Sequence, residues 1–434
     1  MPRSAKSAKP KAAKKKPASG NSAAAGFDLP RLRGELKGRV IAPEDAGYDE
    51  ARVVFYGGVE RRPAVIIRPA NAAEVATVIA LARKTGLPLA VRSGGHSGAG
   101  HGAVDDGIVL DLADMRALDL DVEGQTAWAQ AGLTAGEYTT AAAAHGLATG
   151  FGDTGSVGLG GLTLGGGGNF GVATRFKFRL HPLATVVGGL LVLPATADVI
   201  EGFMAAAESA PEELSGIANI MRAPPMPFLP AEQHGRLVVL GMLVYAGADQ
   251  AAGQRAIAPF RALAAPLADL VRPMPYPEIY PPEEPNYHPV GVSRTLFIDS
   301  VDHAMAELIV NRLEVSTAAL TVCQMRALGG AMARVPVEAT AFAHRGRRIM
   351  VNVAALYEQP GEATTHEAWA NSFAAALSQG DASGYVNFLS DEGAARVRAA
   401  YPGSTWHRLA AIKARYDPTN LFRINQNIEP AAAG

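Results

Sequence analysis

The chain has 434 residues, enough for two or three domains that each bury a core of their own. Hydrophobic residues make up 48% and charged residues 19%, which is typical of a globular protein and not of a disordered one. The formal net charge is −1, but residues 1–26 contain six lysines, one arginine and no acidic residue, so the remainder carries −8. A mildly acidic body argues against a nucleic-acid groove, and no apolar run reaches the ~18 residues of a membrane span.

The basic segment 1–26 is rich in Ala, Lys, Pro and Ser and lacks the apolar stretch of a secretory signal. We expect a disordered, solvated arm. The alternative is a weak tether to nucleic acid on a binding module, and removing 1–26 would then abolish salt-sensitive binding to DNA. The only cysteine, Cys323, excludes an internal disulfide and a cysteine-based metal site. We therefore expect a cytoplasmic protein with no metal and no membrane or nucleic-acid partner.

Alternating strand and helix patterns begin at residue 61. Strands are predicted at 61–70, 87–95, 107–115 and 126–132, and helices at 72–86 and 134–146. Asn71 is a plausible N-cap of the first helix, and a glycine closes it. Strand, helix and strand within about 35 residues form a βαβ unit that ends in a glycine-rich loop.

Beyond about residue 190 the pattern changes to longer strands and helices. Helices are predicted at 196–209, 249–263, 301–319, 366–379 and 406–416, and strands at 236–247, 292–298, 320–330 and 347–357. Proline-rich segments connect them. This alternation favours a second α+β domain whose mostly antiparallel sheet carries helices on one side.

The loop RSGGHSGAGHG (92–102) places small residues around two histidines. Successive backbone N–H groups of a Gly/Ser loop form an anion-binding nest that suits a pyrophosphate. The loop matches neither the dinucleotide-binding fingerprint nor a Walker A loop. By itself, a histidine in such a loop is more often a hydrogen-bonded structural residue than a catalytic one.

This loop resembles the pyrophosphate loop of FAD-linked oxidases of the vanillyl-alcohol-oxidase superfamily, which have a PCMH-type FAD-binding domain. The similarity is to their bacterial, berberine-bridge-enzyme-like branch. The segments GELKGRVIAPEDAGYDEARVV (34–54), LGGAMARVPVEATAFAHR (328–345), YVNFLSDEGAARVRAAY (385–401) and ARYDPTNLFRINQNI (414–428) are similar to the same branch. The resemblance therefore covers nearly the whole chain beyond the tail.

The resemblance implies an α+β fold: an FAD-binding domain of two α+β subdomains and a substrate domain with an antiparallel sheet flanked by helices. We expect the tail at 1–26, the FAD-binding domain at 27–190, the substrate domain at 191–404, and a C-terminal segment at 405–434 that returns to the FAD-binding domain. The aromatic, proline-rich loops of the second domain, with Tyr276, Tyr280, Tyr287 and His288, could line a substrate pocket or serve only for packing.

FAD is the implied cofactor, and His96 matches the histidine that bonds covalently to the 8α-methyl carbon of the flavin. A neutral imidazole nitrogen is a competent nucleophile near neutral pH. Some members attach the flavin a second time through a cysteine near the position of Thr154, which this chain lacks. The implied cofactor-binding residues are Arg92, Ser93, Gly94, Gly95, His96, Ser97, Gly98, His101, Gly102, Gly158, Gly160, Gly161, Asn425 and Asn427.

The implied activity is hydride transfer from a small alcohol, sugar or amine to flavin, with O₂ or another acceptor reoxidising the cofactor. Tyr385 and Asn387 match the positions of the catalytic motif. A phenol can act as the base if nearby charge lowers its pKa towards the working pH. The alternative function is a truncated, non-catalytic flavin-fold protein with weak or no FAD binding.

The run VGLGGLTLGGGGNFGVAT (157–174) departs from the pattern of the family. Relatives carry two separate glycine motifs, with a segment of the FAD-binding domain between them. Here VGLGGLTLGGG (157–167) merges into GGGGNFGVAT (165–174), so the two motifs share glycines. We expect a deletion between two glycine repeats near 165–170. Such a deletion would leave unpaired strand edges and exposed apolar surface, and would weaken the hold on the adenine end of FAD.

Overall fold

The computed structural model describes residues 28–164, 167–282, 284 and 286–432. The predicted tail (1–26) and two of the shared glycines, Gly165 and Gly166, lie outside the described residues. Within the described part, no helix is both long and apolar enough to cross a membrane.

The first subdomain is a small sheet covered by α3 (Ala72–Thr85). The strand order is β1-β2-β4-β3, with β1 Arg39–Ile41, β2 Val65–Arg68, β3 Leu89–Arg92 and β4 Ile108–Asp111. The predicted helix caps are confirmed: the Asn71 side chain accepts from the Glu74 amide, and Gly86 adopts φ +71°. The predicted βαβ unit differs in one respect, because β4 lies between β2 and β3 and pairs in parallel with both.

The second subdomain combines a short antiparallel sheet with α4 (Ala135–Ala143). The sheet order is β5-β6-β8, with β5 Leu118–Asp121, β6 Thr126–Gln130 and β8 Arg175–Arg179. α4 begins with a capping box in which Thr134 and Glu137 satisfy each other's backbone amides. Alternate residues of the three strands and one face of the helix form a shared apolar core around Tyr138.

β8 forms one edge of this sheet, since no other described strand pairs with its far side. The backbones of Thr174 and Leu180 form hydrogen bonds on the side of β6. Because these bonds alternate along an antiparallel strand, the amides of Arg175, Lys177 and Arg179 point to the open edge. An unpaired edge was expected, but it carries cations instead of apolar side chains, which protects it from unwanted strand pairing. The Arg175 guanidinium also covers the exposed indole of Trp128, 4.4 Å from the ring centroid.

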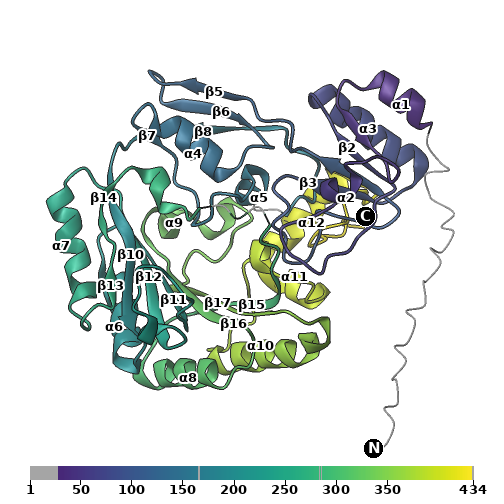
Figure 1. Cartoon of the computed structure of the whole chain (residues 1–434). Coiled ribbons are helices and arrows are strands. Elements are labelled where there is room, and N and C mark those ends of the chain that lie inside the picture. The colour runs from purple at the N-terminus through teal and green to yellow at the C-terminus, as the bar shows by residue number, and fades with distance from the viewer. Residues whose placement is uncertain (1–27, 165–166, 283, 285, 433–434) are drawn as a thin grey trace, which may run out of the picture.

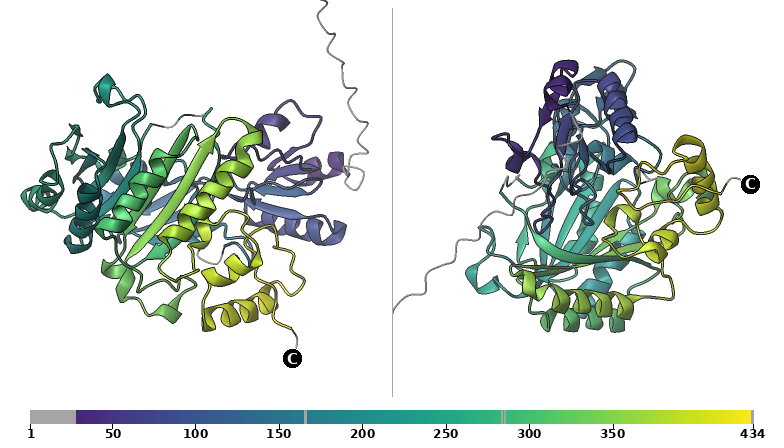
Figure 2. Two further views of the ribbon diagram at one scale, coloured as in Figure 1. Left: turned by 90° about the horizontal axis from the view of Figure 1, so that it is seen from below. Right: turned by 90° about the vertical axis from the view of Figure 1, so that its right-hand side faces the viewer.

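The largest sheet is antiparallel and follows the order β13-β10-β12-β11-β16-β17-β15, with β14 also on β10. Its strands are β10 Val186–Pro194, β11 Leu214–Arg222, β12 Leu237–Tyr245, β13 Ala268–Asp269, β14 Arg272–Met274, β15 Val290–Ile298, β16 Leu320–Ala327 and β17 Ile349–Tyr357. Its helices are α6 Ala197–Ser209, α7 Gln250–Arg261, α8 His303–Glu314 and α10 Ala363–Leu377. Figures 1 and 2 show α6, α8 and α10 on one face, and the two subdomains lie beyond the other face. The expected sheet with helices on one side is confirmed.

The segment after α10 returns to the first subdomain. α12 (Ser404–Tyr416) carries Lys413 against Asn169, and Phe422 enters the core beneath α3. The expected domain boundaries stay predictions, and the chain crosses both of them without a break in its packing. β10 begins at Val186, before the expected boundary at 190. The apolar cluster around Tyr401 includes residues from both sides of the expected boundary at 404.

Candidate functional site

Two glycine loops cross with almost no space between their backbones. A Cβ atom on Gly94 would lie 2.3 Å from the Gly158 amide nitrogen, and a Cβ on Gly158 would lie 2.3 Å from that of Gly94. Ser93 fixes the crossing, because its hydroxyl donates to the Ala131 carbonyl at 2.6 Å and its side chain lies beside Gly160. The predicted loop 92–102 and the first glycine motif therefore meet at one place.

His96 lies next to this crossing, with its ring stacked on Phe55 at a centroid distance of 4.1 Å. Burial lowers the pKa of His96 to about 4, although a hydrogen bond to the Ser156 backbone opposes the shift. The imidazole is therefore neutral at pH 7. One ring nitrogen donates to the Ser156 backbone, and the other keeps the lone pair that a nucleophile needs.

The rest of the loop supports this arrangement from several directions. Gly95 has φ +72°, a conformation that favours glycine. The Ser97 hydroxyl accepts from the His101 amide at 3.4 Å, and burial lowers the pKa of His101. A Cβ atom on Gly98 would lie 3.8 Å from the Ser390 hydroxyl, and a Cβ atom on Gly102 would lie beside the Arg92 side chain. These residues shape the loop.

The Arg92 side chain does not reach the loop surface. It is 5% exposed, and its guanidinium bonds to Asp111 at 2.8 Å. Asp111 also pairs with Arg68 at 2.6 Å. The buried carboxylate of Asp111 therefore holds the guanidinium inside the domain, and a contact of Arg92 with the cofactor stays a prediction.

Tyr385 and Asn387 meet the glycine motif directly. The Asn387 amide donates to the Gly161 carbonyl at 3.0 Å and to the Tyr385 hydroxyl at 2.9 Å. A Cβ on Gly161 would have no neighbour within 4 Å. The Asn387 amide thus joins the phenol to an open glycine turn. Among the described residues, no acceptor for the proton of the phenol is found.

Burial raises the pKa of Tyr385 above its ordinary value, although the Asn387 hydrogen bond and the charge of Arg326 both oppose this. The condition for a phenol base, a pKa lowered towards the working pH, is therefore not met in the protein alone. Arg326 is a cation that sequence inspection missed. It extends from β16 over the Phe388 ring, 5.2 Å from its centroid, and is paired with Asp153 at 2.9 Å. Its position on the alternating strand LTVCQMRA was the available signal.

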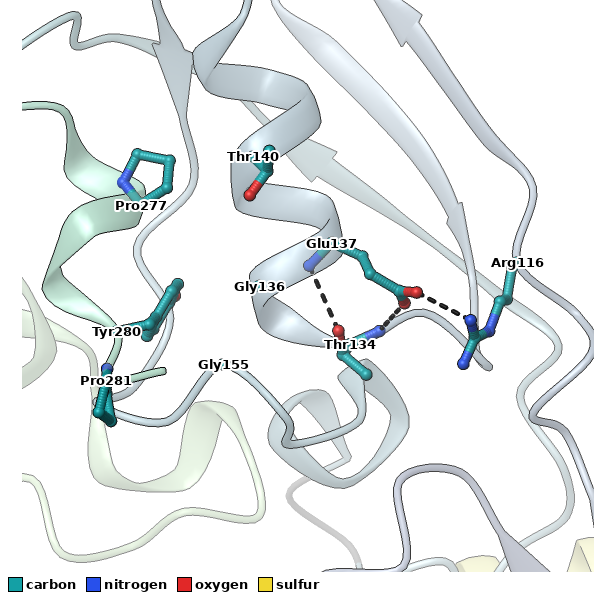
Figure 3. Close-up of a pocket in the computed structure, with 9 residues that line it drawn as sticks. All are labelled: Arg116, Thr134, Gly136, Glu137, Thr140, Gly155, Pro277, Tyr280 and Pro281. Atoms are coloured by element: carbon teal, nitrogen blue, oxygen red, sulfur yellow. Dashed lines mark hydrogen bonds and ion pairs between the residues drawn. The ribbon is translucent and has the colours of Figure 1, made fainter. Parts of the chain in front are cut away.

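The aromatic loop residues separate into two groups. Tyr287 lies edge-on to Phe55, and His288 bonds the Phe55 carbonyl at 3.2 Å, so both lie near the stacking partner of His96. Tyr280 instead lines a pocket of about 440 Å³ between α4 and the turn Tyr276–Ile279 (Figure 3). The Arg116–Glu137 ion pair lies beside this pocket. None of the residues predicted to bind the cofactor or to act in catalysis lines that pocket.

Two family models match this chain: "FAD binding domain" over residues 63–181 and "Berberine and berberine like" over residues 384–429. The (R)-6-hydroxynicotine oxidase of Paenarthrobacter nicotinovorans is 26% identical, with 91% of this chain and 97% of that protein covered. The chain therefore contains both the FAD-binding domain and the berberine-like region, and it is similar over nearly its whole length to FAD-linked oxidoreductases. It is an FAD-dependent oxidoreductase.

Solved structures agree with this assignment at the level of the fold. The 6-hydroxy-D-nicotine oxidase of Arthrobacter nicotinovorans matches with a TM-score of 0.78 at 24% identity, covering 91% of this chain and 98% of that one. The xylooligosaccharide oxidase of Myceliophthora thermophila C1 also gives 0.78, at 21% identity, covering 93% and 100%. Coverage of nearly the whole of these relatives argues against the alternative of a truncated, non-catalytic protein.

The C-terminal asparagines of this oxidoreductase fit a bound FAD. Asn425 donates its amide hydrogens to the carbonyls of Phe422 and Gly168, at 2.9 and 3.3 Å. The Oδ1 atoms of Asn425 and Asn427 are buried without a hydrogen-bond partner among the described residues. Buried polar atoms are normally satisfied, so these two oxygens are available to donors of a ligand. The described residues contain no cluster of His, Cys, Asp and Glu that could hold a metal.

Proposed function

We propose that this enzyme oxidises a CH–OH or CH–NH group of a small organic molecule, with FAD bound covalently through His96 and O₂ as the acceptor. The observation that carries the proposal is the convergence of three segments: the His96 loop, the Gly158–Gly161 turn and the Tyr385–Asn387 pair. Relatives named as oxidases of a hydroxynicotine and of xylooligosaccharides support the same reaction class. Bound flavin supplies the acceptor for a hydride.

The residues of this chain have separate roles in the proposal. The neutral ring of His96 provides the nitrogen for the bond to the flavin, and its neighbour Phe55 limits the orientation of the ring. Asn387 holds the Tyr385 hydroxyl as an acceptor, which leaves the phenolic proton free to bond a substrate oxygen or nitrogen. Because burial keeps the phenol protonated at neutral pH, it takes up a substrate proton only after losing its own.

A covalent flavin is tested by acid precipitation of the protein purified with FAD supplied. We expect a yellow, fluorescent pellet from the native protein and a colourless pellet from His96→Ala, because the variant has no nucleophile at this position. His101→Ala is the matched control: it lies in the same loop, and burial also lowers its pKa, yet its pellet should stay yellow. A colourless native pellet, or a yellow His96→Ala pellet, contradicts the covalent link.

We also propose that the run 157–174 is an internal fusion of two glycine motifs. The alignment to the hydroxynicotine oxidase spans 463 positions, more than the 434 residues of this chain, so it contains positions with no residue here. The open edge of β8, directly after the fused motif, supports loss of neighbouring strands.

The fusion predicts that sequencing the gene across codons 160–172 returns GGLTLGGGGNFGV with no inserted segment. An intact additional segment between the two motifs in the gene would refute the fusion as a property of the protein.

We further propose a cytoplasmic location, where the buried thiol of Cys323 would stay reduced.

A further inference from the structure

The segment that leads into Tyr385 has neither helix nor strand between the end of α10 at Leu377 and the turn Val386–Phe388. Side chains from other elements hold it instead. Arg347 pairs with Asp381 at 2.9 Å, and Arg396 donates to the Ala382 carbonyl. The third contact comes from His344, whose ring lies against the Gly384 backbone. The position of the phenol therefore depends on these three contacts.

His344 is the most enclosed of the three side chains, with 5% of its surface exposed. Its ring stacks on Phe297 of β15 at a centroid distance of 4.4 Å, and Nε2 lies 3.1 Å from the Ala400 carbonyl. The two backbone neighbours of the ring precede two tyrosines: Gly384 comes directly before Tyr385, and Ala400 directly before Tyr401. One imidazole thus joins the backbones that carry both phenols.

A second route from His344 to the phenol runs through Phe342. This ring meets His344 edge-on at 5.5 Å and meets Tyr385 edge-on at 5.8 Å, with interplanar angles of 79° and 81°. Edge-to-face pairs at such distances are attractive and have a defined geometry. The ring of His344 therefore orients Tyr385 through the side chain of Phe342 as well as through the Gly384 backbone.

We propose that His344 is a positioning residue, which fixes the Tyr385 phenol against Asn387 through its contact with the Gly384 backbone and its packing against Phe342. The proposal rests on the proposed function only in placing Tyr385 at the substrate; the contacts themselves do not depend on it. Burial lowers the pKa of His344, with the Ala400 and Gly384 backbones and Asp381 opposing it and Arg347 adding to it. The neutral ring has one N–H group. A substitution of His344 therefore removes the aromatic contacts and a single hydrogen bond.

The test is a tyrosinate titration of the purified flavoprotein. Each variant is compared with a second protein that carries the same substitution together with Tyr385→Phe. The difference between the two titration curves is the signal of Tyr385. In His344→Leu we expect the raised pKa of Tyr385 to fall towards its ordinary value, because the segment is released and water reaches the phenol. His344→Asn, which keeps a donor close to the ring position, should restore most of the native pKa. Phe342→Leu removes the edge-on contact alone and should give a smaller downward shift.

The matched control is His366→Leu. His366 is also buried, at 3% exposure, and stacks on Tyr357 at 5.3 Å, but it does not contact the Tyr385 segment in the described structure. The proposal is overturned if His366→Leu shifts the titration of Tyr385 as much as His344→Leu does. It is also overturned if neither His344→Leu nor Phe342→Leu changes the titration. Because the titration uses no substrate and the flavin link is scored separately by acid precipitation, a failure of the proposed function gives a different pattern of results.

Discussion

Replacing Lys413 with methionine is expected to lower the free energy of unfolding by about 3–5 kcal/mol, the usual cost of removing one partner of a buried ion pair. Lys413 and Asp417 are both 0% exposed, and Nζ lies 2.8 Å from the carboxylate. The ammonium also donates to the carbonyls of Asn169 and Phe422, each at 2.7 Å. The substitution therefore leaves one buried carboxylate and two buried carbonyls without their cation.

The measurement is denaturant unfolding of the native protein and Lys413→Met, followed by tryptophan fluorescence. Arg31→Met is the matched control, since Arg31 and Glu35 form a pair with the same spacing on an exposed surface, and such pairs contribute little. The double variant Lys413→Met with Asp417→Leu should recover part of the loss, because no unpaired charge remains. Equal stability of Lys413→Met and the native protein would contradict this assignment.

The same carboxylate predicts a loss of stability in acid. Burial would raise the pKa of Asp417, but Lys413 and the amides of Phe422 and Leu421 outweigh it, so the pKa is lowered. A carboxyl whose folded pKa lies below its unfolded value adds stability above the unfolded value, and this stability is lost as the pH falls through the folded pKa. Lys413→Met should remove much of that dependence, which unfolding curves at several acidic pH values would show.

The sequence predicted those parts of the fold that depend on neighbouring residues. The N-cap Asn71 and the terminal Gly86 bound α3 as expected, because capping is satisfied within a few residues of the helix end. The insertion of β4 between β2 and β3 was not predicted. Strand order within a parallel sheet is decided by the packing of the finished domain, and a local hydrophobic pattern does not encode it.

The candidate site also has features that the sequence predicted and features that it did not predict. The resemblance to the family pointed to the glycine loops at His96 and Gly158, and the structure brings these loops together because close backbone approach requires residues without side chains. The pKa of Tyr385 and the direction of the Arg92 side chain were not predictable, because both depend on burial by distant segments. Asp153, which pairs with Arg326, lies 173 residues from it in the chain. Only the folded domains bring Asp153 and Arg326 together beside Phe388.

Gly158→Ala is expected to disrupt the crossing of the two glycine loops and to abolish covalent flavin incorporation. The backbone at Gly158 has φ −70° and ψ 139°, which alanine adopts without strain. The damage therefore comes from the added methyl group, which would lie 2.3 Å from the Gly94 nitrogen and 2.4 Å from the Ser93 hydroxyl. Overpacking of this kind costs about 1–3 kcal/mol, and here it separates the loop that carries His96 from the turn that meets Asn387.

Two further substitutions separate packing from access to the cofactor. Gly152→Ala adds a methyl group with no neighbour within 4 Å, outside the predicted site, and should leave stability and flavin content unchanged. A methyl group on Gly161 also meets no described residue from outside its own turn within 4 Å, so Gly161→Ala should fold normally and yet bind less flavin if this turn faces the cofactor. The measurements are the unfolding midpoint of each variant and the ratio of flavin to protein absorbance in its acid pellet. A Gly158→Ala protein with native flavin content would show that the loops can separate without loss of function. A Gly161→Ala protein with native flavin content would place the cofactor away from the turn that Asn387 and Tyr385 face.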